Sequence, residues 1–198
     1  MLLLSEKECP YTAEVLDVDF DSHDSFYSYA VPVLVDGSVS VAGIMPISRF
    51  LDEKIPRHKL FSEDFSERLL QWQIMDFFSN VLYQDSIRGL LDARFNRNSR
   101  VSTEGLRRLR DVLRECLDIL EIVVTEGMVL GNGKLSQADL LYGAYISCLD
   151  YLGEVVWRKY PAQRDFYMSL KCRPSFRPII EEWIAACTPP PHYTMLDF

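Results

Sequence analysis

The chain has 198 residues, of which 48% are hydrophobic and 25% are charged, a balance typical of a globular protein long enough for a sizeable core. Its 21 basic and 29 acidic residues give a formal net charge of −8, which argues against nucleic acid or an anionic membrane surface as the main partner.

Two further features bear on where the protein works. Apolar runs stay below the roughly 18 residues of a membrane span, and Met1–Leu4 is too short for the core of a signal peptide. The five cysteines form an odd set without metal-type CxxC spacing: Cys9, Cys116, Cys148, Cys172 and Cys187. Packing thiols in a reducing compartment are the favoured interpretation. We therefore expect a cytoplasmic protein that is not inserted in a membrane.

Short β-type runs characterise the first 54 residues. They cover Thr12–Val18, Val31–Val35 and, more weakly, Val39–Val41. Asp36-Gly37 predicts a hairpin between the last two, because glycine adopts the positive φ that such turns require. Pro46–Lys54 then predicts a short helix with proline in its first turn. Together these elements predict a small α/β unit over residues 1–54, followed by a linker over residues 55–61.

Helical periodicity replaces this pattern from about residue 62. Ser62–Asp64 can cap a long helix in which apolar residues recur every three or four positions. A second long helix is expected to start near Ser102 or Thr103 and to end at Gly127. Its apolar stripe consists of Leu106, Leu109, Leu113, Cys116, Leu117, Leu120, Val123 and Val124. A stripe of this kind is typical of the core of a helical bundle.

The next helix begins with a side-chain cap. Ser136 can accept a hydrogen bond from the amide of Asp139, whose carboxylate can accept one from the amide of Ser136. The helix that follows, Leu140–Tyr151, is apolar on nearly all sides, so we expect it at the centre of the bundle. The cap alone explains Asp139, and we assign Ser136 and Asp139 a structural role.

These segments resemble the glutathione S-transferase superfamily. Val31–Gly37 is similar to its strand and hairpin, and Gly131–Asp139 is similar to the start of the central helix in its all-α domain. The segments Leu149–Gly153 and Lys171–Pro178, with the C-terminal residues 192–198, resemble the alphaproteobacterial FzlA-like branch. The resemblance implies a fold with a thioredoxin-like α/β domain followed by an all-α bundle over 62–187. Members of this branch bind FtsZ, the cell-division GTPase.

The glutathione-binding residues of the family are largely missing. Leu2–Glu8 is similar to the end of the family's first helix, so the first strand and the catalytic loop before it are absent. The Glu/Asp-Ser pair that binds the γ-glutamyl carboxylate is replaced by Gly43 and Ile44. What remains is Val31-Pro32, which in the family exposes backbone groups to glutathione through a cis peptide bond. We assign Val31 and Pro32 as a vestigial glutathione site and assign no catalytic residue.

The missing strand raises a structural question. In the family it lies between the strands that Thr12–Val18 and Val31–Val35 resemble, so its removal leaves backbone groups without partners. Three alternatives are open: the true start lies upstream of Met1, another segment or partner chain fills the gap, or the small domain is distorted.

The tail over residues 188–198 has two interpretations. Pro189–Pro191 favours an extended polyproline conformation and excludes helix. The residues that follow place apolar groups at a chain end, which suggests either docking onto the bundle or binding to another protein. The partner-binding candidates, given by the resemblance, are His192, Tyr193, Leu196, Asp197 and Phe198. The prolines of Arg173–Pro178 instead favour a structural joint between two helices.

Other chemistry is poorly supported by the sequence. His23, His58 and His192 are scattered through loop-like segments, so we predict no metal site. The acidic residues between Asp17 and Asp24 lack the glycine and the distal glutamate of a calcium loop, so a solvated loop is the better interpretation.

The leading hypothesis is a non-catalytic glutathione S-transferase-fold protein that binds FtsZ and supports cell division. The resemblance also implies a homodimer, formed by the helices over Ser62–Phe95 and Ser102–Gly127. The rival hypothesis is a glutathione S-transferase that conjugates glutathione to small electrophiles, with its catalytic loop missing from this chain. A stress-response adaptor on the same fold is a third and weaker possibility.

Overall fold

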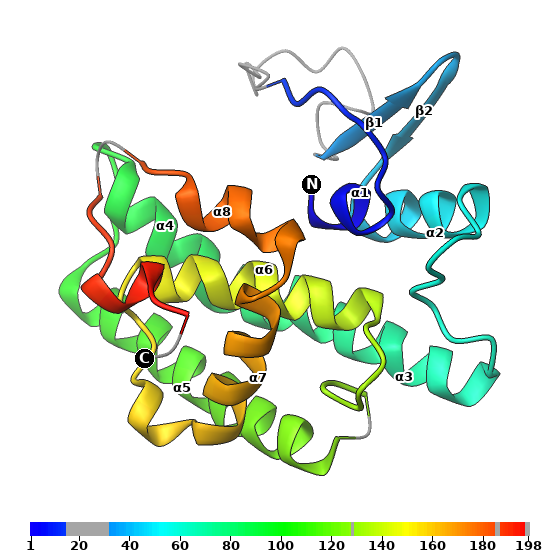
Figure 1. The fold of residues 1–198 in the computed structure, drawn as a ribbon. Coiled ribbons are helices and arrows are strands. Elements are labelled where there is room, and N and C mark those ends of the chain that lie inside the picture. The colour runs from blue at the N-terminus through cyan, green and yellow to red at the C-terminus, as the bar shows by residue number, and fades with distance from the viewer. Residues whose placement is uncertain (15–31, 128, 185–186, 197–198) are drawn as a thin grey trace. The chain divides into compact units, whose positions relative to one another are not determined.

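The computed structural model describes residues 1–14, 32–127, 129–184 and 187–196. The chain divides into two compact units, Met1–Phe61 and Ser62–Phe198, and Figure 1 colours it from blue at the N-terminus to red at the C-terminus. Residues 55–61, which the sequence suggested as a linker, fall within the first unit. Each unit is described on its own below.

The first unit contains a hairpin between two helices. Its elements are α1 (Leu2–Glu6), β1 (Val33–Asp36), β2 (Val39–Ala42) and α2 (Ile44–Lys54). The two strands pair antiparallel, with Asp36 opposite Val39, and Gly37 in the connecting turn has a φ of 61°. The predicted hairpin is therefore confirmed. In the predicted Thr12–Val18 strand, residues 12–14 have no regular structure, and residues 15–18 lie outside the described part of the chain.

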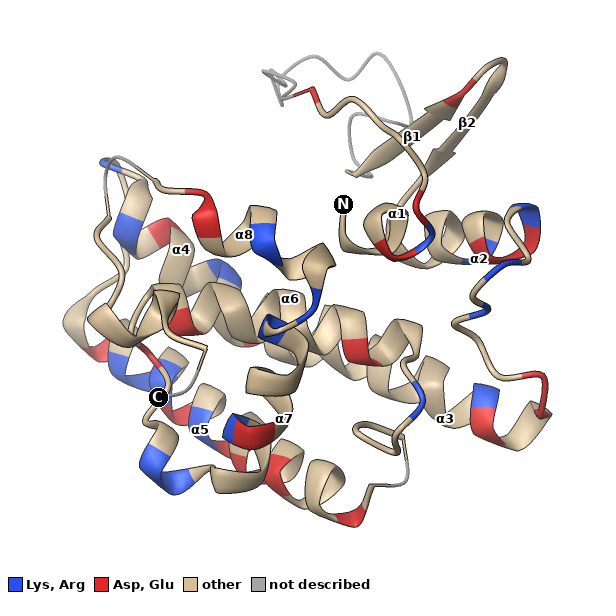
Figure 2. Cartoon of the chain, viewed as in Figure 1, with Lys and Arg blue, Asp and Glu red and all other residues tan. Residues whose placement is uncertain are grey.

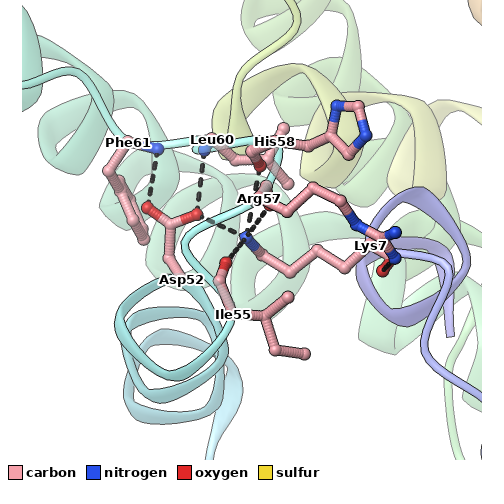
Figure 3. A network of polar contacts seen from close by, with 7 residues as sticks. All are labelled: Lys7, Asp52, Ile55, Arg57, His58, Leu60 and Phe61. Atoms are coloured by element: carbon pink, nitrogen blue, oxygen red, sulfur yellow. Dashed lines mark hydrogen bonds and ion pairs between the residues drawn. The ribbon is translucent and has the colours of Figure 1, made fainter.

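A buried lysine connects α1 to the segment after α2 (Figure 3). The Lys7 side chain is fully buried, and its Nζ lies 2.9 Å from Oδ1 of Asp52. The same ammonium group donates hydrogen bonds to the carbonyl oxygens of Ile55, Arg57 and His58, at 2.9, 3.3 and 3.2 Å. A buried charge is costly unless it is paired and hydrogen-bonded, and here both conditions are met.

Asp52 completes this network from the other side. Its carboxylate accepts hydrogen bonds from the backbone amides of Leu60 and Phe61, at 2.9 and 3.2 Å. The carboxylate therefore fixes the end of the segment whose beginning is held by Lys7, as Figure 3 shows. These contacts attach residues 55–61 to α1 and α2 of the first unit.

The second unit is a helical bundle. Its elements are α3 (Phe65–Asp76), η2 (Phe77–Ile87), α4 (Arg88–Phe95), α5 (Thr103–Glu126), α6 (Gln137–Tyr151), η3 (Trp157–Lys159), α7 (Pro161–Lys171), η4 (Pro174–Phe176), α8 (Arg177–Glu181) and η5 (Pro191–Thr194). Elements α3, η2 and α4 follow one another directly, so residues 65–95 make one long helical segment whose middle has π-type hydrogen bonding.

Side-chain caps mark the helix starts that the sequence predicted. The carboxylate of Asp64 accepts a hydrogen bond from the amide of Glu67, and Ser102 Oγ accepts one from the amide of Gly105. Helix α5 ends at Gly127, which has a φ of 62° and satisfies the last carbonyls in a left-handed conformation. The two long helices before the central one are therefore confirmed.

Helix α6 lies at the centre of the bundle, as its composition predicted. Twelve of its residues are buried, and they come from all sides of the helix. Gly143 allows the closest approach, because a Cβ atom there would lie 2.3 Å from Cζ of Phe176. Phe176 itself is fully buried in the turn between α7 and α8. Arg173–Pro178 is thus a joint whose aromatic residue packs into the core.

Candidate functional site

The start of α2 is where the resemblance implies a site for the γ-glutamyl group. Gly43 is the N-cap of α2, with a φ of 90° and no side-chain hydrogen bond to the helix. The first hydroxyl along α2 belongs to Ser48, one turn after the helix start; it is buried and donates to the carbonyl of Ile44 at 2.7 Å. Pro46 contributes no amide. The residues described here therefore offer no polar side chain to an incoming carboxylate.

The vestigial glutathione site is only partly described. Pro32 is exposed, and its carbonyl accepts a hydrogen bond from the amide of Gly43 at 2.9 Å. The carbonyl of Pro32 therefore already has a hydrogen-bond partner at the end of the hairpin. Val31, whose backbone groups would contact glutathione, lies outside the described residues.

The structure places most of the described tail against the bundle. Tyr193 is only 2% exposed, and its hydroxyl lies 3.0 Å from Oγ of Ser147 in α6. Its ring packs edge-on against that of Tyr151. His192 Nε2 lies 2.9 Å from Oδ1 of Asp150. Two of the proposed partner-binding residues, His192 and Tyr193, are thus engaged within the chain.

The end of the tail is more accessible. Met195 and Leu196 are both close to half exposed, and Asp197 and Phe198 lie outside the described residues. Of the five partner-binding candidates, Leu196 is therefore the described residue that offers apolar surface to solvent.

Two buried charged residues hold the tail, and the sequence reasoning missed both. Lys171 is 2% exposed, and its Nζ donates to the carbonyl oxygens of Tyr193 and Met195, at 2.7 and 2.6 Å. Burial lowers the pKa of Lys171, while the charge of Asp150 acts in the opposite direction. Asp150 also accepts a hydrogen bond from the indole of Trp157 at 2.7 Å. Lys171 is the last residue of the amphipathic helix α7, where a lysine is usually exposed, so the sequence did not predict its burial.

The cap of α6 has the geometry of a capping box. Ser136 Oγ accepts from the amide of Asp139 at 3.2 Å, and the Asp139 carboxylate accepts from the amides of Ser136 and Gly131 at 2.7 and 3.1 Å. Burial raises the pKa of Asp139, although these hydrogen bonds act against the rise. Because the carboxylate accepts two backbone hydrogen bonds in this loop, the cap accounts for Asp139 without a further function.

The described residues were compared with the requirements of a metal site and of a membrane-spanning helix. No group of three or more histidine, cysteine or acidic side chains in the described part of the chain could hold a metal ion. None of the described helices is long and apolar enough to span a bilayer. All five cysteines are free thiols.

The helical bundle contains a cavity that the sequence did not predict. It has a volume of about 390 Å³ and is lined by residues from α4, α5 and the segment 152–160. Four of its lining side chains are basic: Arg94, Arg110, Arg114 and Lys159. We call this cavity the basic pocket. Its residues come from three separate segments, so no single motif could have indicated it.

Comparisons with known proteins agree with this architecture. No family model matches the chain. A glutathione S-transferase from Sinorhizobium meliloti superimposes with a TM-score of 0.89 at 28% identity, covering 100% of this chain and 92% of that one. The structure of FzlA from C. crescentus superimposes with a TM-score of 0.84 at 24% identity, covering 100% of this chain and 92% of that one. The chain has the fold of the glutathione S-transferase superfamily.

A sequence relative narrows the position within the superfamily. The chain is 28% identical over 176 residues to FtsZ-localized protein A of Caulobacter vibrioides, which covers 84% of this chain and 77% of the relative. This similarity agrees with the resemblance of the C-terminal segments to the FzlA-like branch. The expected fold, a thioredoxin-like unit with a helical domain, is confirmed.

Proposed function

We propose that the protein is a non-catalytic member of the superfamily that binds FtsZ and acts in bacterial cell division. The observation that carries this proposal is the similarity to FtsZ-localized protein A along 84% of the chain. The protein would act in the cytoplasm, where FtsZ polymers assemble.

The start of α2 supports the non-catalytic part of the proposal. A helix N-terminus binds a carboxylate well when its free amides and a hydroxyl face the ligand. Here the cap is Gly43, the next residue is the apolar Ile44, and the hydroxyl of Ser48 is turned onto its own helix. Glutathione would lose its γ-glutamyl contacts, and its binding would be correspondingly weak.

We place the partner-binding residues at the end of the tail. His192 and Tyr193 hold the tail on the bundle, which leaves Leu196 as an exposed apolar group beyond the last carbonyl bound by Lys171. In this proposal Leu196, Asp197 and Phe198 contact FtsZ, and the docked residues before them set the direction in which these three project.

Co-sedimentation with GTP-assembled FtsZ from the same organism tests the proposal. The full chain should pellet with polymers in a saturable manner, and a variant lacking Leu196–Phe198 should pellet at least tenfold less. Because this deletion keeps the contacts of Lys171 with Tyr193 and Met195, it should not unfold the bundle. Trp183→Ser is the matched control, since Trp183 is 61% exposed and lies outside the tail.

The outcomes separate the parts of the proposal. Absence of pelleting by folded full-length protein would overturn the FtsZ-binding function. Equal pelleting of the full chain and the shortened variant would keep FtsZ as the partner but remove the tail from its binding surface.

We further propose that the protein is a homodimer, as the superfamily resemblance implies. The helices expected at the interface carry exposed apolar side chains: Phe65 is 62% exposed and Leu69 is 41% exposed on α3, and Ile122 is 59% exposed on α5. Light scattering should give the mass of two chains for the parent protein and of one chain for Leu69→Glu. Trp183→Glu, outside these helices, should remain dimeric. A monomeric parent protein would contradict the proposal.

Glutathione conjugation is the alternative function, favoured by the similarity to the Sinorhizobium meliloti glutathione S-transferase at 28% identity. Calorimetric titration with reduced glutathione distinguishes the two. The non-catalytic proposal predicts no binding below millimolar concentration. Micromolar binding together with turnover of a model electrophile would favour the enzyme instead.

A further inference from the structure

The basic pocket combines positive charge with an apolar floor. Leu113, Leu117 and Tyr160 line it and are at most 4% exposed, so each is packed in the bundle and presents only part of its surface to the cavity. Ligand pockets in proteins commonly have volumes of 300–1,000 Å³, with apolar walls and a few polar groups. At about 390 Å³, this cavity has room for a small organic molecule.

The charge of the lining runs against that of the whole protein. Four basic side chains line the cavity against one carboxylate, Glu154, whereas the chain as a whole carries −8. Figure 2 shows basic and acidic residues interspersed along α5. The local excess of positive charge in the pocket therefore comes from bringing Arg94 and Lys159 beside the arginines of α5. Such a concavity concentrates anions from solution.

One basic side chain of the lining already pairs with a carboxylate of the chain. Arg110 binds Glu154 through two parallel hydrogen bonds, Nε to Oε2 at 2.8 Å and Nη2 to Oε1 at 2.7 Å. Bidentate pairing of this type is the geometry by which a guanidinium selects carboxylates. It occupies only one of the four basic groups.

The remaining basic groups are less completely neutralised. Arg114 pairs with Asp111 on the solvent-exposed face of α5. Arg94 donates to the sulfur of Cys187 at 3.5 Å, and sulfur is a weak hydrogen-bond acceptor. Lys159 is exposed and makes no ion pair with any residue in the described ranges. Arg94 and Lys159 therefore keep positive charge available to a ligand.

The phenol of Tyr160, which lines the basic pocket, adds no negative charge to it. Burial, followed by the influence of Asp118, raises the pKa of Tyr160 to about 12. The side chain is consequently neutral at physiological pH and is compatible with a bound anion.

We propose that the basic pocket binds an amphipathic organic anion, a small carboxylic acid with an apolar body. The acid group meets Arg94 and Lys159, and the apolar body lies on Leu113, Leu117 and Tyr160. The lining residues of this site all belong to the second unit, and none of them lies at the start of α2 or at the end of the tail. It gives the protein a ligand-binding function independent of its proposed partner.

Calorimetric titration of the full chain with 2-naphthoate tests the proposal, with the uncharged 2-naphthamide as the matched compound. The acid should bind with submillimolar affinity and the amide at least tenfold more weakly, because only the acid can use the charged groups. The double variant Arg94→Gln/Lys159→Gln should weaken binding of the acid at least tenfold.

A second double variant controls for net charge. Arg107→Gln/Arg108→Gln removes two charges from exposed positions of α5 that do not line the cavity, and it should bind 2-naphthoate as the parent does. Equal binding of acid and amide would overturn the proposal. Unchanged binding by the Arg94/Lys159 variant, or no binding by the parent at millimolar acid, would overturn it as well. Circular dichroism of each variant confirms that the bundle is folded.

Discussion

At the scale of single residues, one glycine of the core has no room for a side chain. Gly143 lies on the central helix α6, where an added Cβ would approach Cζ of Phe176 to 2.3 Å and Leu170 Cδ1 to 3.2 Å. Neither neighbour is at a flexible surface, since Phe176 and Leu170 are both buried. The glycine is therefore required by packing, although alanine has the higher helix propensity.

Gly143→Ala should destabilise the protein by about 1–3 kcal/mol, because overpacking in a dense core forces neighbouring side chains to move. Chemical denaturation gives the free energy of unfolding. The double variant Gly143→Ala/Phe176→Leu should recover part of the loss, since a smaller side chain makes room for the new methyl group. Gly143→Ala with unchanged stability would contradict the packing argument.

At the scale of elements, the tail is a structural part of the bundle up to Met195. Tyr193 fills a buried site against Ser147 and Tyr151, and Lys171 binds the carbonyls of Tyr193 and Met195. Deleting residues 189–198 would expose these groups and remove two carbonyl acceptors from the buried ammonium group of Lys171.

That deletion should lower the free energy of unfolding by at least about 3 kcal/mol, the usual cost of removing a large buried aromatic side chain. Deletion of Leu196–Phe198 alone should have little effect, because Leu196 is 46% exposed. Thermal denaturation of the two shortened proteins compares them directly. Equal melting temperatures for both would mean that the docked tail contributes nothing to stability.

Local signals explain which elements could be predicted from sequence. Asp36-Gly37 fixes a turn, and Ser102 and Ser136 fix helix starts, because each acts on backbone groups within three residues. The pairing of Lys7 with Asp52 joins residues 45 positions apart, and the basic pocket joins three segments. Contacts of this kind leave no periodic pattern. The sequence of the tail was compatible both with docking onto the bundle and with binding another protein. The structure shows that Tyr193 is docked.

At the scale of the whole molecule, the thiols of Cys116 and Cys148, one buried and one partly buried, make stability depend on pH. Burial raises the pKa values of Cys116 and Cys148 to about 11, from an ordinary value near 9. The folded state thus holds these protons more tightly than the unfolded chain does. Their contribution is fully present below pH 9 and is lost as the pH rises towards 11.

Unfolding by guanidinium at pH 7.5 and pH 10 measures this effect. Each thiol should account for about 1 kcal/mol of lost stability at pH 10. The variant Cys116→Ala/Cys148→Ala should lose correspondingly less between the two pH values, even if it is less stable at both. Parent and variant with the same pH dependence would show that these thiols do not titrate as described.

The network around Lys7 has a consequence for how this sequence can vary among relatives. Lys7 binds the backbone carbonyls of residues 55, 57 and 58. Every amino acid supplies such a carbonyl, so substitutions at these three positions leave the acceptors in place. In an alignment the three positions could differ freely while Lys7 and Asp52 changed together or stayed the same. Covariation would then identify only the pair Lys7 and Asp52, although Lys7 also binds the backbone of residues 55, 57 and 58.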